Sequence, residues 1–161
     1  ILARFPDMRW NGEIDIAPLP NVRTDVCDIL KATPEYFLDA SGGSLFDCVL
    51  SDMAPNTGGH GDDYLSVRLC RRVLELLPMV LAPGGTMCIK VLEGEGFPEL
   101  LKDVKWLFAD SGATKPRSSR DVSREMFITG YHYAPRPESR NHRPPNVAPP
   151  APTPPPGWNV R

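Results

Sequence analysis

The chain has 161 residues, of which 41% are hydrophobic and 24% are charged, and its formal net charge is −2 at pH 7. This length suits one domain with a sizeable core, and the composition is that of a soluble globular protein. The slightly negative charge excludes a protein that is basic overall, which is a common feature of nucleic-acid binders. No stretch approaches the run of about 18 apolar residues that a membrane helix needs, so we expect no membrane association.

Segments typical of strands and helices alternate along the chain. Alternating charged and apolar residues predict a short strand over 13–17, and β-branched residues predict a second strand over 22–29. A proline at the first helical position predicts a helix over 34–40. The apolar run Cys48-Val49-Leu50, which is bounded by turn residues, predicts a buried strand.

The longest predicted helix comes next, because apolar residues recur every three or four positions between Leu65 and Val80. We expect Asp62 or Asp63 to cap this helix and Pro83-Gly84-Gly85 to end it. The remaining predicted elements are a strand over 86–92, a helix over 98–108, a short strand near 113–115 and a strand over 125–133. The alternation of strand and helix predicts an α/β fold with a mostly parallel sheet.

Proline divides the chain into two parts. Ten of the 19 prolines lie between Pro135 and Pro156, in a segment with almost no aliphatic residues. Such a segment buries too little apolar surface to offset the entropy lost on ordering. We therefore expect a folded domain over residues 1–133 and a Pro-rich disordered tail over residues 134–161.

The four cysteines form no C-x-x-C pair, and three of them lie in apolar runs. This pattern argues against a metal or disulfide framework and favours small buried side chains in a reducing compartment. We therefore expect a cytoplasmic protein that contains no metal ion. We also expect it to be a monomer.

Three polar residues stand at the ends of predicted strands. Asp52 follows one strand, Lys90 lies near the carboxyl end of the next, and Glu125 begins the last. Open α/β sheets bind ligands at the carboxyl edge of their strands. The three side chains converge there if these strands are neighbours and the last one is antiparallel. A surface salt bridge is the alternative, although a buried strand rarely carries a lysine without a partner.

Residues 115–143 carry seven Lys or Arg and three Asp or Glu, so this segment is locally basic within an acidic chain. A local basic face can bind phosphate groups, although an ordinary solvated surface explains the same composition.

Four motifs extend the pattern around these residues. They are SDMAPN at 51–56, LAPGG at 81–85, KVLEGEGF at 90–97 and KPRSSRDVSREMFITG at 115–130. In this order and spacing they resemble the FtsJ-like (RlmE-type) family of ribosomal RNA 2′-O-ribose methyltransferases. The resemblance implies a Rossmann-like methyltransferase fold with an antiparallel last strand, S-adenosylmethionine (SAM) as cofactor, and large-subunit rRNA, at a uridine, as substrate.

The resemblance also implies roles for individual residues. Asp52, Lys90 and Glu125 match three members of the family's Lys-Asp-Lys-Glu catalytic set, in which the lysine acts as base or stabilises the alkoxide. The implied cofactor-binding residues are Asp28, Asp52 and Asp15. The implied RNA-binding residues are Asn56, Lys115, Arg117 and Arg120.

Two features of the family have no match in these 161 residues: the first catalytic lysine, and the strand with its Gly-rich cofactor turn. We therefore expect an N-terminally incomplete domain and weak or no SAM binding by the isolated chain. Alternative functions are methylation of tRNA or an mRNA cap, or RNA binding without catalysis. A nucleotide-binding oxidoreductase is a further alternative, but the sequence has no dinucleotide fingerprint.

Overall fold

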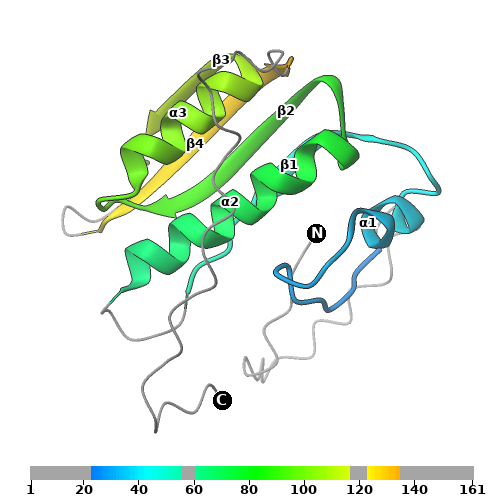
Figure 1. The fold of residues 1–161 in the computed structure, drawn as a ribbon, viewed down its shortest axis with the longest axis horizontal. Helices are drawn as coiled ribbons and strands as arrows, with labels where there is room; N and C mark the ends of the chain where they lie inside the picture. Colours follow the sequence, from blue (N-terminus) through cyan, green and yellow to red (C-terminus); the bar gives the residue numbers. More distant parts are fainter. Residues whose placement is uncertain (1–22, 56–60, 117–122, 135–161) are drawn as a thin grey trace, which may run out of the picture.

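The structure is a computed structural model, and it describes residues 23–55, 61–116 and 123–134. Strands and helices alternate in this part of the chain, as the sequence predicts (Figure 1). The elements are α1 (Pro34–Ala40), β1 (Phe46–Ser51), α2 (Asp62–Val80), β2 (Leu81–Leu92), α3 (Phe97–Leu107), β3 (Phe108–Thr114) and β4 (Glu125–Tyr133).

The described strands form one sheet in the order β1-β2-β4-β3. Strand β1 pairs with β2 in parallel, whereas β4 runs antiparallel to both of its neighbours, β2 and β3. The predicted antiparallel last strand is therefore confirmed, and the fold is a Rossmann-like α/β fold.

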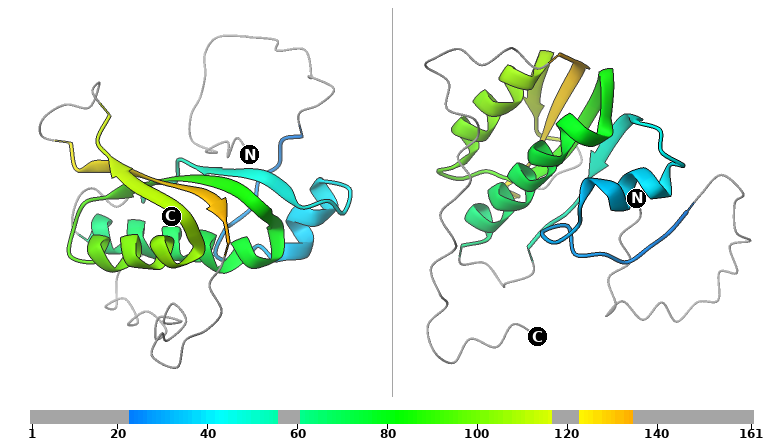
Figure 2. Two further views of the ribbon diagram at one scale, coloured as in Figure 1. Left: turned by 90° about the horizontal axis from the view of Figure 1, so that it is seen from above. Right: turned by 45° about the vertical axis from the view of Figure 1, so that its right-hand side comes forward.

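Helices α2 and α3 lie on the same face of the sheet (Figure 2). Side chains from both layers form the core between them, and Leu77, Ile89, Leu100 and Ile128 are completely buried there. Among the described elements, no helix covers the opposite face of the sheet. That face carries Lys90, so the side chains around Lys90 are not enclosed by the helical layer.

The start of α2 differs from the prediction. Its N-cap is Gly61, with a φ of 80°, and neither Asp62 nor Asp63 occupies that position. Both aspartates instead lie in the first turn, where their negative charge interacts favourably with the helix dipole. Glycine takes the cap because a left-handed backbone has a steric cost for other residues.

Strand β2 begins at Leu81, five residues before the predicted start at Thr86. The segment Pro83-Gly84-Gly85 lies within the strand and coincides with a shift in its register with β1. A Cβ at Gly85 would lie 2.9 Å from the carbonyl oxygen of Ala82, so only glycine fits there without rearrangement. The glycines therefore permit an irregular strand start, and α2 has already ended at Val80.

The last two strands pack tightly over α3. Strand β3 extends from Phe108 and is longer than the short strand predicted near 113–115. A Cβ at Gly130 of β4 would approach the Phe108 ring to 2.6 Å. The absence of a side chain at Gly130 thus makes room for a fully buried aromatic ring.

The predicted strand over 22–29 is wrong, because residues 23–28 are irregular and a turn begins at Ile29. Val26 is 71% exposed, so its β-branched side chain has no buried surface to pack against. The predicted strand over 13–17 and residues 135–161 of the predicted tail lie outside the described residues. None of the described helices has the length and apolarity needed to span a bilayer.

Candidate active site

Asp52 and Lys90 meet because β1 and β2 are parallel neighbours. Ser51, the last residue of β1, is aligned with Ile89 of β2. The next residues along the two strands are Asp52 and Lys90, and their Oδ1 and Nζ atoms are 2.7 Å apart. The parallel register therefore creates this ion pair.

Glu125 reaches the same lysine from the other side of β2. In the antiparallel pairing, Lys90 is aligned with Phe127 and Leu92 with Glu125. Residues two apart on a strand share a face, so Glu125 is a diagonal neighbour of Lys90 on the face without helices. Its Oε1 atom lies 3.6 Å from Lys90 Nζ. The predicted convergence of acid, lysine and acid is confirmed as geometry.

The three side chains differ in their contact with solvent. The Lys90 side chain is only 13% exposed, whereas the Asp52 and Glu125 side chains are 79% and 43% exposed. The lysine is thus held by its strand and flanked by two carboxylates that solvent or a ligand can reach. This arrangement can present an amine to a hydroxyl group and hydrogen-bond the rest of the ligand at once.

Two small polar residues of α2 hold the end of β2 in place. The buried hydroxyl of Ser66 accepts a 2.9 Å hydrogen bond from the Leu92 amide, and the Cys70 thiol donates to the Lys90 carbonyl at 3.2 Å. Burial raises the pKa of Cys70 to about 12, so the thiol keeps its proton. Sequence reasoning missed this pair. The sequence pattern that could have indicated it is a pair of small polar residues, four positions apart, on the apolar face of a predicted helix.

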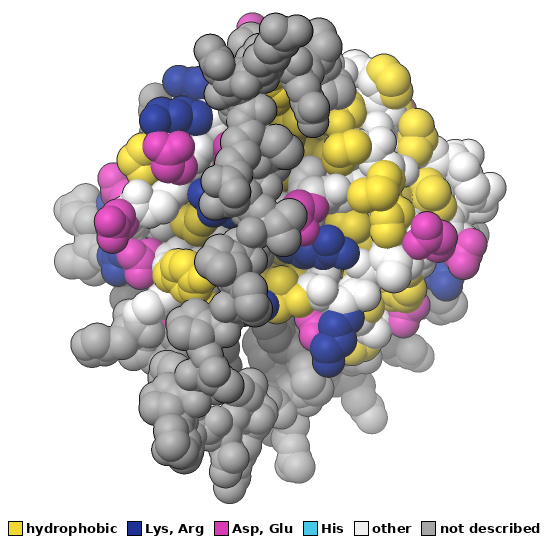
Figure 3. Space-filling model, in the orientation of Figure 1, with side chains coloured by type: hydrophobic (Ala, Val, Ile, Leu, Met, Phe, Trp, Pro, Cys, Tyr) yellow, Lys and Arg dark blue, Asp and Glu magenta, His cyan; other side chains and the backbone are white. Residues whose placement is uncertain are grey.

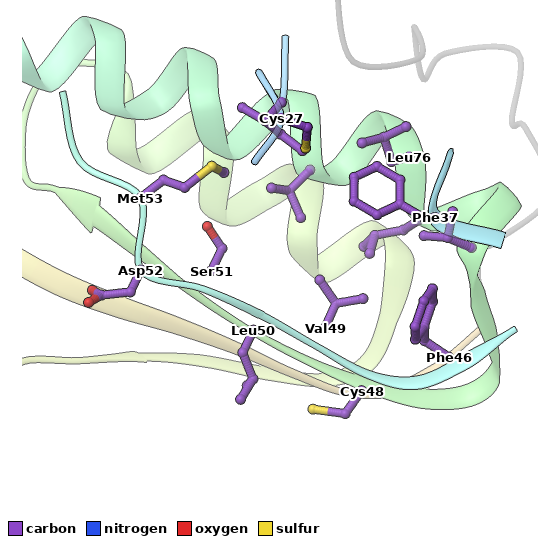
Figure 4. Close-up of a pocket in the computed structure, with 14 residues that line it drawn as sticks. Cys27, Phe37, Phe46, Cys48, Val49, Leu50, Ser51, Asp52, Met53 and Leu76 are labelled. Carbon is purple, nitrogen blue, oxygen red and sulfur yellow. The ribbon is translucent and has the colours of Figure 1, made fainter. Parts of the chain in front are cut away.

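A pocket of about 340 Å³ lies between β1 and α2, with Asp52 in its wall. Figure 4 shows Val49 and Ser51 pointing toward the helix and Cys48 and Leu50 pointing away from it. Most of the wall is apolar, and polar oxygen atoms come from Ser51 and Asp52 near one end. The pocket therefore suits a ligand with an apolar part and a polar end near Ser51 and Asp52.

The surface next to this pocket is also apolar. Figure 3 shows hydrophobic side chains gathered toward α1 and the end of α2, where Leu30 and Met79 are exposed. Cys27 and Cys48 are exposed as well, and only Cys70 is buried. The expectation of buried cysteines is wrong for these two, because Cys27 lies in an irregular segment and Cys48 on an edge strand.

Of the predicted cofactor-binding residues, Asp28 and Asp52 are among the described ones and Asp15 is not. Asp28 lies between Cys27 and Ile29, two residues that line the pocket. Its carboxylate accepts a hydrogen bond from the Leu30 amide at 3.0 Å and lies 3.6 Å from Lys31 Nζ. Asp15 lies outside the described residues.

Of the predicted RNA-binding residues, only Lys115 is among the described ones. It follows Thr114, the last residue of β3, which is aligned with Phe127 of β4. Because Phe127 is also aligned with Lys90, Lys115 lies near the end of the sheet that holds the ion pairs. Asn56, Arg117 and Arg120 lie outside the described residues.

Comparison with known proteins places the chain in a family. Residues 9–133 match the family of FtsJ-like methyltransferases. The ribosomal RNA large subunit methyltransferase E of Desulfatibacillum aliphaticivorans is 41% identical over 125 residues, which are 73% of this chain and 59% of that protein. The protein of the same name from Pseudomonas fluorescens Pf-5 is 44% identical over 103 residues, which are 63% of this chain and 49% of that protein.

A solved structure has a similar fold. The crystal structure of a protein described as a ribosomal RNA methyltransferase, from Plasmodium falciparum, aligns with a TM-score of 0.64 and 25% identity. The alignment covers 74% of this chain and 68% of that protein. The chain spans about half the length of the curated relatives that it matches. Because the family match extends over most of its residues, the chain belongs to the FtsJ-like methyltransferase family.

Proposed function

We propose that this chain carries the acceptor side of a SAM-dependent enzyme that methylates a ribose 2′-hydroxyl of large-subunit rRNA, at a uridine. The observation that carries the proposal is the placement of Lys90 between Asp52 and Glu125. A hydroxyl group becomes a better nucleophile when a base beside it accepts its proton, and a lysine amine can be that base. The names of the curated relatives, which are ribosomal RNA large subunit methyltransferases, support rRNA as the substrate.

Lys90 acts at the ribose oxygen in this proposal. As a neutral amine it accepts the hydroxyl proton, and as an ammonium it stabilises the negative charge that develops on that oxygen. Asp52 and Glu125 fix the direction of the amine through the two ion pairs and offer carboxylate oxygens to the substrate. SAM supplies the methyl group that the ribose oxygen receives.

The pocket beside Asp52 supports a cofactor site. Its apolar wall, with Val49 and Met53, suits the adenine of SAM, and the oxygen atoms of Ser51 and Asp52 suit the polar remainder. In this proposal Asp28, Asp52 and Asp15 contact the cofactor. RNA contacts come from Lys115 and from Asn56, Arg117 and Arg120, and the enzyme works in the cytoplasm.

Transfer of a labelled methyl group from SAM to large-subunit rRNA, offered both as free rRNA and within large ribosomal subunits, tests the proposal. The assay uses the 161-residue chain at millimolar SAM, because we expect weak cofactor affinity. The Lys90→Ala variant should lose methyl transfer, whereas Lys102→Ala, which removes an exposed lysine paired with Glu99 at 2.8 Å, should keep it. Equal activity of the Lys90→Ala variant and the wild type excludes the proposed role of Lys90. Binding of rRNA without methyl transfer by the wild type favours the alternative of an RNA-binding protein without catalysis.

A further inference from the structure

Arg124 immediately precedes Glu125, and its guanidinium group contacts two other segments. The Nε and Nη2 atoms donate to the Glu93 carbonyl oxygen at 2.9 and 2.5 Å. The Nη2 atom also lies 3.3 Å from Oδ2 of Asp63 in the first turn of α2. In return, the Glu93 amide donates to the Arg124 carbonyl oxygen at 2.7 Å. We call this set of contacts among Arg124, Glu93 and Asp63 the arginine latch.

The arginine latch lies where the β2–β4 ladder ends. The last aligned pair of that ladder is Leu92 and Glu125, and the latch joins the residues directly beyond it, Glu93 and Arg124. Glu93 follows the last residue of β2 and is three residues after Lys90, and Arg124 is adjacent to Glu125. The latch therefore fixes the ends of both strands that bring Lys90 and Glu125 together.

The packing around the arginine latch leaves little room for adjustment. A Cβ at Gly94 would overlap the carboxylate of Asp63, so the loop after β2 lies directly against the start of α2. Glycine at this position allows that close approach. The Asp63 side chain is only 30% exposed, and its position is thus set by both the loop and the guanidinium group.

The exposure of Arg124 limits what the arginine latch adds to the free energy of unfolding. Its side chain is 52% exposed, and ion pairs of such exposed groups add little to the free energy of unfolding. Its hydrogen bonds have a directional effect instead, because a planar guanidinium group holds several acceptors in fixed positions. The Lys90–Glu125 contact, at 3.6 Å, is longer than the Lys90–Asp52 contact at 2.7 Å, so a small displacement of Glu125 would break it.

We propose that Arg124 is a positioning residue, which holds the Glu125 carboxylate within reach of Lys90 through the arginine latch. This inference rests on the proposed role of Lys90 in methyl transfer. Arg124 itself does not contact Lys90 in this arrangement. It acts through Glu125 and through the end of β2.

The first test measures the position of Lys90 without any need for activity. The experiment uses the full 161-residue chain and compares the NMR signal of the Lys90 Cε–Hε group among variants. This signal is identified by its disappearance in Lys90→Arg. Arg124→Met should shift this signal, and Arg124→Lys, which restores a charge near Asp63, should shift it less. Arg23→Met is the matched control, because Arg23 is 58% exposed and also contacts a backbone carbonyl and a carboxylate, those of Asp39 and Asp25.

An unchanged Lys90 signal in Arg124→Met, in a chain whose backbone spectrum shows the native fold, overturns the inference. Should Arg124→Met fail to fold, Asp63→Asn provides the same comparison, because it weakens the latch and keeps the arginine. A Lys90 shift as large in Arg23→Met as in Arg124→Met also overturns it.

The second test separates positioning from binding. In the methyl-transfer assay, Arg124→Met should lower kcat by about 10- to 100-fold, as displacement of a catalytic group does, with the KM for SAM almost unchanged. Arg124→Lys should recover part of the loss. A rise in KM at unchanged kcat overturns the positioning role. Absence of methyl transfer by the wild type at millimolar SAM refutes methyl transfer by this chain instead, and the NMR comparison then still decides whether Arg124 positions Glu125 against Lys90.

Discussion

Replacing Lys90 with methionine should separate catalysis from stability. The Lys90 side chain is 13% exposed, so its apolar stem is largely buried and methionine keeps most of that packing. The two ion pairs that are lost have partners that are 79% and 43% exposed, so each pair contributes no more than about 1 kcal/mol. Methionine also avoids the desolvation cost of a nearly buried ammonium group. We therefore expect the free energy of unfolding to change by less than about 1 kcal/mol.

The effect of Lys90→Met on methyl transfer should be much larger. Loss of a group that transfers a proton or stabilises an oxyanion lowers the rate by about 10²- to 10⁴-fold, or about 3–5 kcal/mol in the activation barrier. Urea unfolding followed by circular dichroism gives the first quantity, and labelled-methyl transfer to rRNA gives the second. Lys102→Met, which removes an exposed ion pair at 2.8 Å, is the control for both. A loss of more than about 3 kcal/mol in stability would refute this reasoning and make Lys90 a structural residue.

Two further predictions concern the fold. Gly130→Ala should lower the free energy of unfolding by about 1–3 kcal/mol, because the new Cβ lies 2.6 Å from the Phe108 ring. Gly112→Ala, with open space at its Cβ, should change it by less than about 1 kcal/mol in the same urea titration. Burial raises the pKa of Cys70 from 9.0 to about 12, so the unfolded chain releases this proton first as the pH rises. Stability should therefore fall between about pH 9 and 12, and Cys70→Ala should flatten that slope in unfolding curves measured across this range.

The sequence predicts the elements that have strong local patterns. The predicted helix over 34–40 and the predicted strand over 125–133 have the observed bounds. A proline at the first helical position and a run of β-branched and aromatic residues account for these two results. The ion pairs of Lys90 follow from the order of the strands, because the residues at adjacent strand ends can be aligned once the last strand is known to be antiparallel.

Features that depend on tertiary packing do not follow from the sequence. The β-branched residues of the segment 22–29 predict a strand, but no neighbouring strand pairs with its described part. Pro83-Gly84-Gly85 is typical of a helix end, yet this segment lies within β2, because Leu81 before it and Thr86 after it both pair with β1. In the sequence, Arg124 is only one of the seven positively charged residues of the segment 115–143. Its contacts with Glu93 and Asp63 require the folded chain, because they join segments 31 and 61 residues away.

The ion pairs and the pocket depend on different parts of the sheet. Lys90 lies on β2, which has a described neighbour on each side, so two ladders and the arginine latch determine its position. The pocket instead borders β1, whose other edge pairs with no described strand and whose Leu50 is 70% exposed. Changes at the free edge of β1 should therefore alter cofactor affinity more than the position of Lys90. Val49→Ser, which changes a pocket side chain that points toward α2, should then change SAM affinity while the Lys90 Cε–Hε signal stays in place, and the reverse result would contradict this separation.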